Sequence, residues 1–439
     1  MKIDTMLLGL EDAGDNARRL EEIGLDGAFT FEGPQDVFFP LALAASATTS
    51  LDLMTNVAIA FPRNPIQLAH QANDLQVLSH GQFSLGLGAQ VRAQVERRYG
   101  VPFDRPLARM RELIGALRAI FDCWEQGSRL DFRGEFYQHT LMSPMFNPGP
   151  NPYGKPPILL GALGPQMTRL AAEVADGLLV MPFNSKRHFH ERTLPAISEG
   201  LARANRVSDG FSVIGEVIVC CGRDAAELAA ADEATRWLLS FYASTPSYRP
   251  VLEVEGWGDL QPELNAMAKQ GRWDELPSRI DDQMLSTLAV RGTPKEVAAA
   301  IVDRFGGHVD RVGFYTPYAV NPDVLGELVD ALHGLYPAAA VGARAVEARA
   351  VEVPGPATSG HVDPTIRIVP ITGGSIRLGQ LLKLADFADT GGDAKALLEA
   401  GAVRVNGEVE VRRGRQLCDG DLIASGGNTV KVIAEREAD

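Results

Sequence analysis

Short apolar segments alternate with amphipathic helical segments eight times along residues 1–336, and this alternation limits the possible folds more than any other feature. The predicted strands are Lys2–Leu8, Gly27–Phe31, Leu51–Ala60, Phe83–Leu87, Pro157–Leu160, Gly177–Met181, Phe211–Cys221 and Val309–Tyr315. Strands that alternate with helices form parallel sheets covered by those helices. Eight such units predict a closed (β/α)8 barrel. An open doubly wound sheet is the alternative, but no GxGxxG follows the first strand.

The segment from Asn64 to Gly100 shows this repeating unit most clearly. Apolar residues recur at helical spacing from Ile66 to Leu78, and His80-Gly81 ends the helix. The next strand is apolar and runs into a glycine-rich loop. In parallel α/β proteins ligands bind beyond the carboxyl ends of the strands, so this loop is a candidate ligand site. Glycines that only relieve crowding are the other interpretation.

The literal sequence of this segment, LSHGQFSLGLGAQVRAQVERRYG, resembles the fourth strand and following loop of the luciferase-like hydride-transferase superfamily. The resemblance continues through RPLARMRELIGALRAIFDCW, FRGEFYQHTLMSPMFNPGP and GPQMTRLAAEVADGLLVMPF. It covers most of residues 1–336 and is strongest to the branch that uses the deazaflavin coenzyme F420. The resemblance implies a TIM barrel of the bacterial luciferase-like type, with insertions, that transfers a hydride between F420 and an organic substrate. An FMN-dependent monooxygenase is the alternative.

The resemblance also implies which residues form the site. Glu32, at the end of the second strand, is the predicted catalytic acid or base, and a solvated loop glutamate is the alternative. Three stretches are implied to contact the cofactor: Asn56, Val57 and Ala58; Ala89, Gln90 and Val91; and Gly161, Ala162, Leu163, Gly164, Pro165, Gln166 and Met167. Many relatives carry a non-proline cis peptide at the first stretch. The third opens a helix, whose N-terminal N–H groups suit a phosphate, although it also fits an ordinary βα turn.

Other residue patterns exclude some classes of site. The histidines are scattered, HExxH is absent, and the four cysteines contain no CxxC pair. We therefore predict no metal site, and buried reduced thiols in place of disulfides. The insertion Ser244–Gln283 carries Tyr248, Trp257 and Trp273, which predict pocket walls or the surface of a homodimer.

The composition changes from Pro337 onward. A tandem ARAVE repeat and PGPATSG predict a linker over residues 337–364. Residues 365–439 resemble the small S4-like RNA-binding domain, an α+β unit, on Thr390-Gly391-Gly392, Val405-Asn406-Gly407-Glu408 and Arg412-Arg413-Gly414-Arg415. Asn406-Gly407 is in addition a strong hairpin-turn signal. The resemblance implies binding of structured RNA through Lys395, Arg404, Arg412, Arg413 and Arg415.

Charge argues against a protein that binds RNA and uses the barrel only as a scaffold. The chain carries a net charge of −14, and residues 375–439 hold nine basic against eleven acidic side chains. Strong nucleic-acid binding normally rests on a basic face, so a protein-contact role for the tail is an alternative. No apolar run has the length of a membrane span or signal peptide, and we expect a cytoplasmic protein.

Overall fold

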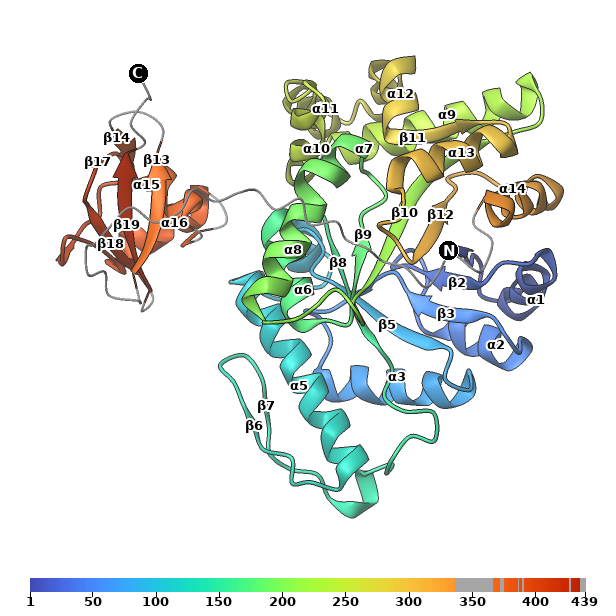
Figure 1. Ribbon diagram of the computed structural model, residues 1–439, viewed down its shortest axis with the longest axis horizontal. Helices are drawn as coiled ribbons and strands as arrows, with labels where there is room; N and C mark the ends of the chain where they lie inside the picture. Colours follow the sequence, from blue (N-terminus) through green and yellow to red (C-terminus); the bar gives the residue numbers. More distant parts are fainter. Residues whose placement is uncertain (336–365, 372–374, 386, 389–390, 426–427, 435–439) are drawn as a thin grey trace. The chain divides into compact units, whose positions relative to one another are not determined.

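The computed structural model describes residues 1–335, 366–371, 375–385, 387–388, 391–425 and 428–434. The chain divides into two compact units, Met1–Val346 and Glu347–Asp439 (Figure 1). Each unit has a hydrophobic core of its own. The predicted linker, with its ARAVE repeat, lies outside the described residues.

Eight parallel strands of the first unit close into a barrel (Figure 1). In ring order they are β1 (Lys2–Met6), β2 (Gly27–Thr30), β3 (Asp52–Thr55), β5 (Phe83–Gly88), β8 (Ile158–Ala162), β9 (Gly177–Val180), β10 (Ser212–Cys221) and β12 (Arg311–Tyr315). The last strand, β12, pairs with the first, with Arg311 opposite Lys2, and this pairing closes the ring. The predicted (β/α)8 barrel is confirmed. The predicted strand Leu51–Ala60 is interrupted, because only Ala58–Ile59 resumes pairing after β3, as β4.

Helices surround the barrel on its outer side (Figure 1). They are α1 (Ala13–Ile23), α2 (Phe39–Ala47), α3 (Pro65–Leu78), α4 (Arg92–Arg97), α5 (Pro106–Gln126), α6 (Pro165–Val174), α8 (Leu194–Arg203), α9 (Ala225–Ala243), α13 (Pro294–Phe305) and α14 (Pro322–Leu335). Between α5 and β8 lie a short hairpin, β6 (Phe132–Arg133) with β7 (Gln138–His139), and the 3₁₀ turn η1 (Pro144–Phe146). Shorter elements complete the C-terminal half: α7 (Lys186–His188), η2 (Phe189–Thr193), η3 (Pro246–Tyr248), α10 (Arg249–Val254), α11 (Leu260–Lys269), η4 (Trp273–Arg279), α12 (Asp282–Leu288) and β11 (Ala289–Gly292).

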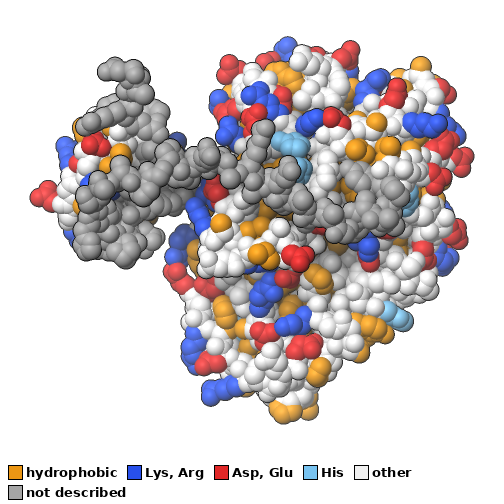
Figure 2. Space-filling model, viewed as in Figure 1, with side chains coloured by type: hydrophobic (Ala, Val, Ile, Leu, Met, Phe, Trp, Pro, Cys, Tyr) orange, Lys and Arg blue, Asp and Glu red, His pale blue; other side chains and the backbone are white. Residues whose placement is uncertain are grey.

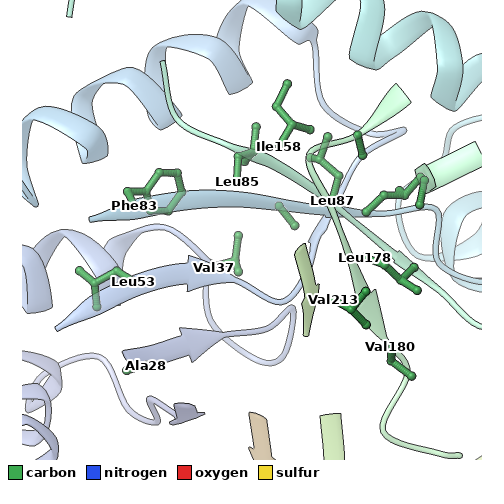
Figure 3. Packing of buried hydrophobic residues seen from close by; sticks show 14 of the residues in the cluster. Ala28, Val37, Leu53, Phe83, Leu85, Leu87, Ile158, Leu178, Val180 and Val213 are labelled. Carbon is green, nitrogen blue, oxygen red and sulfur yellow. The ribbon is translucent and has the colours of Figure 1, made fainter. Parts of the chain in front are cut away.

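Side chains alternate between the two faces of each barrel strand. Phe83, Leu85 and Leu87 of β5 belong to the main core between the barrel and its helices, and Figure 3 shows them along one strand. A smaller cluster of inward-pointing residues fills the barrel itself, with Phe29 and Ile214 among its members. This alternation decides which polar residues of a strand lie inside the barrel.

An ion cluster lies at the end of the barrel where the strands begin. Arg311 of β12 binds the carboxylate of Asp4 on β1, with Nε at 2.8 Å from Oδ2, and donates to Asp52 of β3 at 2.6 Å. The Asp4 side chain is fully buried. Burial alone lowers the pKa of Arg311, but the charges of the two aspartates outweigh it and raise that pKa above its usual value. The cluster therefore joins the first and last strands of the ring, and Arg311 keeps its positive charge.

The second unit combines two helices with small sheets. Its larger sheet has the order β13 (Ile366–Ile371), β19 (Asn428–Ala434), β18 (Leu422–Ser425), β15 (Val403–Val405) and β16 (Glu408–Val409). A second pair joins β14 (Ser375–Arg377) and β17 (Gln416–Cys418), and the helices are α15 (Leu378–Leu384) and α16 (Gly391–Glu399). Asn406-Gly407 forms the predicted turn between β15 and β16, and both residues have positive φ.

The surface of the barrel unit mixes charges of both signs. Figure 2 shows acidic and basic side chains interspersed over the visible face. Apolar side chains are exposed at Phe39 and Leu43 of α2 and at Val77 and Leu78 of α3. Exposed apolar groups of this kind are common at subunit contacts, and the homodimer stays a prediction. Among the described residues, no helix is both long enough and apolar enough to cross a membrane.

The ion cluster leads to a prediction about stability. In an Arg311→Leu variant the buried Asp4 would lose its cation, which typically costs about 3–5 kcal/mol of unfolding free energy. The exposed pair of Lys2 with Asp52 provides the control, since Lys2→Leu should cost about 1 kcal/mol or less. Urea unfolding followed by tryptophan fluorescence measures both, because all four tryptophans lie in the barrel unit. Equal losses in the two variants would contradict the assignment.

Candidate active site

The three stretches predicted to hold a cofactor meet at the ends of neighbouring strands. They follow β3, β5 and β8, which pair side by side in that order. After β3 the chain returns as β4, which pairs with the end of β5, so that Ile59 lies opposite Gly88. Asn56–Ala58, Ala89–Val91 and Gly161–Met167 therefore lie together on the rim where the strands end. That rim is where barrel enzymes place their active sites.

Val57 forms the centre of this wall. The peptide between Asn56 and Val57 is cis, as the resemblance implies. A Cβ added to Gly88 would lie 2.4 Å from Cγ2 of Val57, and one added to Gly161 would lie 2.8 Å from Cγ1. Both glycines leave room for the Val57 side chain, so relief of crowding accounts for Gly88 in the glycine-rich loop and for Gly161 on β8.

Gly164 differs from those glycines because the space around it is open. It is the N-cap residue of α6, with Pro165 in the first turn, and a Cβ at this position would meet no atom within 4 Å. The hydroxyl of Thr168 donates to the Gly164 carbonyl at 3.0 Å and fixes the turn. A side chain at Gly164 would therefore enter the open space beside the wall without disturbing the protein around it.

Glu32 lies on the same rim, where other groups hold its carboxylate. It forms an ion pair with Arg63, accepts from the Ile59 N–H at 3.1 Å and accepts from the Tyr99 hydroxyl at 3.2 Å. Its side chain is only 8% exposed. Burial and then the charge of Glu32 raise the pKa of Tyr99. Three groups thus hold the Glu32 carboxylate in place, and its role as acid or base stays a prediction.

The structure adds a second carboxyl group that sequence reasoning missed. Glu216 stands in the middle of β10 and shares the inward face with Ile214. Asn56 donates a hydrogen bond from Nδ2 to Oε1 of Glu216, across the barrel. Burial raises the pKa of Glu216 to about 8, and the nearby charge of Asp4 adds to the rise although the Asn56 hydrogen bond opposes it. The signal available in the sequence was an acidic residue inside an apolar strand, SVIGEVIVCC.

Aromatic side chains surround the space beside Glu216. Gly313 of β12 lies opposite Glu216, and Tyr315 lies two residues further along the same strand. The Tyr315 ring contacts the ring of Phe31, with centroids 5.5 Å apart. Tyr242 of α9 is hydrogen-bonded to Tyr315 and packs on Tyr248 at 5.7 Å. Tyr248, at the beginning of the insertion Ser244–Gln283, thus supplies part of this wall. Trp273 of the same insertion lies on the surface and is 41% exposed.

The basic residues predicted to bind RNA are mostly engaged within the tail. Arg412 and Arg415 both bind Glu410, at 2.8 and 2.9 Å, and these contacts hold the pKa of Glu410 below its usual range. Lys395 pairs with Glu399 at 3.6 Å. Arg404 donates to the Gly407 carbonyl at 3.0 Å. The Arg413 side chain lies over Gly379, whose added Cβ would come within 2.5 Å of it. RNA binding stays a prediction.

The other candidate sites are less suited to bind a ligand or a metal ion. A cavity of about 480 Å³ lies beside α7 and α13, but Lys186 is paired with Asp303 and Arg304 donates to four backbone carbonyls. Among the described residues, no three His, Cys, Asp or Glu side chains are grouped to hold a metal ion. All four cysteines are free, and the prediction that they are buried is wrong for Cys418.

Comparison with known proteins agrees with this geometry. The profile of a family described as luciferase-like monooxygenase matches residues 4–311, and that of the S4 domain matches residues 369–433. A protein of Mycobacterium tuberculosis described as uncharacterised is 48% identical over 303 residues, which is 69% of this chain and 89% of the relative. A 5,10-methylenetetrahydromethanopterin reductase of Archaeoglobus fulgidus is 27% identical, covering 66% of this chain and 83% of the reductase.

Solved structures share the barrel. The coenzyme F420-dependent tetrahydromethanopterin reductase of Methanopyrus kandleri superposes with a TM-score of 0.65 at 20% identity, over 76% of this chain and 99% of that one. A riboflavin lyase with modified FMN superposes at 0.57 and 15% identity, over 76% and 91%. At these identities the likeness concerns the fold, and proteins named for either cofactor share it. Because the family profile spans more than half of the sequence, the chain belongs to the luciferase-like monooxygenase family and carries an additional S4 domain.

Proposed function

We propose that this protein is an oxidoreductase that transfers a hydride between the deazaflavin coenzyme F420 and an uncharged organic substrate. The observation that carries the proposal is the wall at the barrel rim, where Val57 fills the space left by Gly88 and Gly161. The F420-dependent reductase named above shares this barrel, and the 27% identical relative is a reductase. The aromatic residues around Tyr315 favour an apolar substrate.

The residues present suit a flat ring system that carries a phosphate. Val57 offers a broad apolar surface behind a ring, and Gly164 leaves open space where the N-terminus of α6 begins. Backbone N–H groups at a helix start attract anions. The coenzyme, when bound, supplies the hydride, and the chain orients it, excludes water and holds a proton for the acceptor.

An FMN-dependent monooxygenase is the second candidate. The riboflavin lyase structure with modified FMN shares this fold, and FMN too combines a flat ring with a phosphate. The wall at Val57 suits both ring systems. Direct titration with the two cofactors distinguishes the candidates.

The first test of the proposal is cofactor binding. Reduced coenzyme F420 should bind at micromolar concentration or better, and FMN should bind more weakly. In Gly164→Val the new side chain would occupy the open space, and F420 affinity should fall at least tenfold, or about 1.4 kcal/mol. Fluorescence titration measures both cofactors.

Gly307 offers a matched control for this variant. It lies between α13 and β12, away from the rim, and an added Cβ would likewise meet no atom within 4 Å. Gly307→Val should leave affinity unchanged. Tighter binding of FMN than of F420 would favour the monooxygenase, and unchanged affinity in Gly164→Val would remove that glycine from the cofactor site.

For the S4 domain we propose weak, salt-sensitive contact with structured RNA. Phosphate contacts release counterions, so affinity for an RNA hairpin should fall steeply as salt rises. Arg404 donates to a neutral carbonyl, whereas Lys395, Arg412 and Arg415 are paired with carboxylates. Its positive charge is therefore better placed to meet a phosphate, and Arg404→Glu should lower RNA affinity by about tenfold, or about 1.4 kcal/mol. Lys383→Glu on α15 is the control reversal. A full-length chain that ignores RNA at low salt would leave protein contact as the role of this domain.

A further inference from the structure

Glu216 carries a buried carboxyl group at the rim to which the proposed function gives no role. Glu216 is 3% exposed, and it lies between the predicted cofactor wall and the aromatic side of the site. On the wall side its partner is Asn56, the residue that precedes Val57. On the other side stand Tyr315 and Tyr242, and the charge of Glu216 acts on the pKa of both tyrosines.

The backbone makes room for this carboxyl. Glu216 lies opposite Gly313 of β12, and a Cβ at Gly313 would come 3.2 Å from Cγ of Glu216 and 3.3 Å from the Phe29 ring. Gly313 therefore leaves space that Glu216 and Phe29 fill. The position of Glu216 inside the barrel follows from the strand register and from this missing side chain.

Glu216 also differs from Glu32 in its electrostatic surroundings. Glu32 is paired with the cation of Arg63. The charged group that acts on Glu216 is another acid, Asp4, whose own cation is Arg311. The remaining groups that face it are the neutral Asn56, Tyr315 and Tyr242. A carboxyl in such surroundings keeps its proton, as known catalytic acids do in apolar sites.

We propose that Glu216 is the proton-carrying residue of this site and protonates the acceptor during hydride transfer. The acceptor in this inference rests on the proposed function, whereas the protonated state of Glu216 does not depend on it. A hydride that reaches an electrophilic carbon breaks the π bond and moves its electron pair to the neighbouring oxygen or nitrogen. That atom takes the proton from the Glu216 carboxyl, directly or through the Tyr315–Tyr242 pair. Oxidation of the reduced coenzyme would release one proton to solvent besides the hydride, and solvent would return one proton to the Glu216 carboxylate, so atoms and charge balance.

The protonated state can be measured in the full chain without cofactor. Infrared difference titration should show the C=O band of a protonated carboxyl at neutral pH, lost with a midpoint near pH 8. The band should be missing in Glu216→Gln and present in Glu32→Gln. This comparison is needed because burial also raises the pKa of Asp4. A band that persists in Glu216→Gln, or no band in the wild type, overturns the proposal.

Stability gives an independent reading of the same group. Because the pKa of Glu216 is raised on folding, its stabilising contribution is complete below the unfolded value of 4.5 and is lost as pH rises through about 8. The melting temperature of the wild type should therefore fall relative to Glu216→Gln over that range. Should the Gln variant not fold, Asn56→Ala serves in its place. Loss of the Asn56 hydrogen bond should move the infrared midpoint to higher pH, and an unmoved midpoint would count against the geometry.

Proton delivery itself is tested with reduced coenzyme F420 and 2-cyclohexenone, an uncharged carbonyl acceptor, as the probe. Glu216→Gln should slow hydride transfer by about 10²–10⁴-fold while cofactor affinity is kept. The alkaline limb of the rate profile, near pH 8 in the wild type, should disappear in this variant. A rate that survives in Glu216→Gln but is lost in Glu32→Gln would overturn the proposal and make Glu32 the acid. Absence of turnover in the wild type would count against the proposed coenzyme or acceptor, while the infrared result still decides the state of Glu216.

Discussion

Closure of the barrel between β12 and β1 is the constraint on which the rest of the structure depends. Backbone pairing brings the last strand beside the first, and Arg311 adds ionic contacts to Asp4 and Asp52 on two other strands. Parallel strands in a closed ring must all end on one rim. The residues that follow β2, β3, β5, β8 and β12 therefore converge there, although long stretches of sequence separate them.

Alternation along the strands then divides the interior into zones of different chemistry. Inward positions near the strand starts hold the ion cluster, the middle holds apolar residues such as Phe29 and Ile214, and the rim holds Asn56 and Tyr315. Glu216 lies beside this apolar zone, where desolvation acts strongly and the charge that acts on it is that of another acid, Asp4.

The two rim carboxyl groups show how surroundings divide roles between identical side chains. Glu32 has a guanidinium, a backbone N–H and a hydroxyl around it. Glu216 has one amide donor and an acidic neighbour. Surroundings that differ in this way suit the two carboxyl groups to different roles in acid–base chemistry. The S4 domain shows the opposite use of charge, because Glu410 neutralises the arginines beside it.

Local pattern in the sequence determined the eight strands, the helices between them, the α6 cap at Gly164 and the Asn406-Gly407 turn, because neighbours in the chain decide periodicity, caps and tight turns. The cofactor stretches could be named from the resemblance, since each follows a strand. Tertiary structure alone decided that Arg63 holds Glu32, that Val57 explains Gly88 and Gly161, and that Asn56 meets Glu216 from 160 residues away. Those contacts depend on strand register around a closed ring, and the raised pKa of Glu216 depends on burial, neither of which a linear pattern specifies.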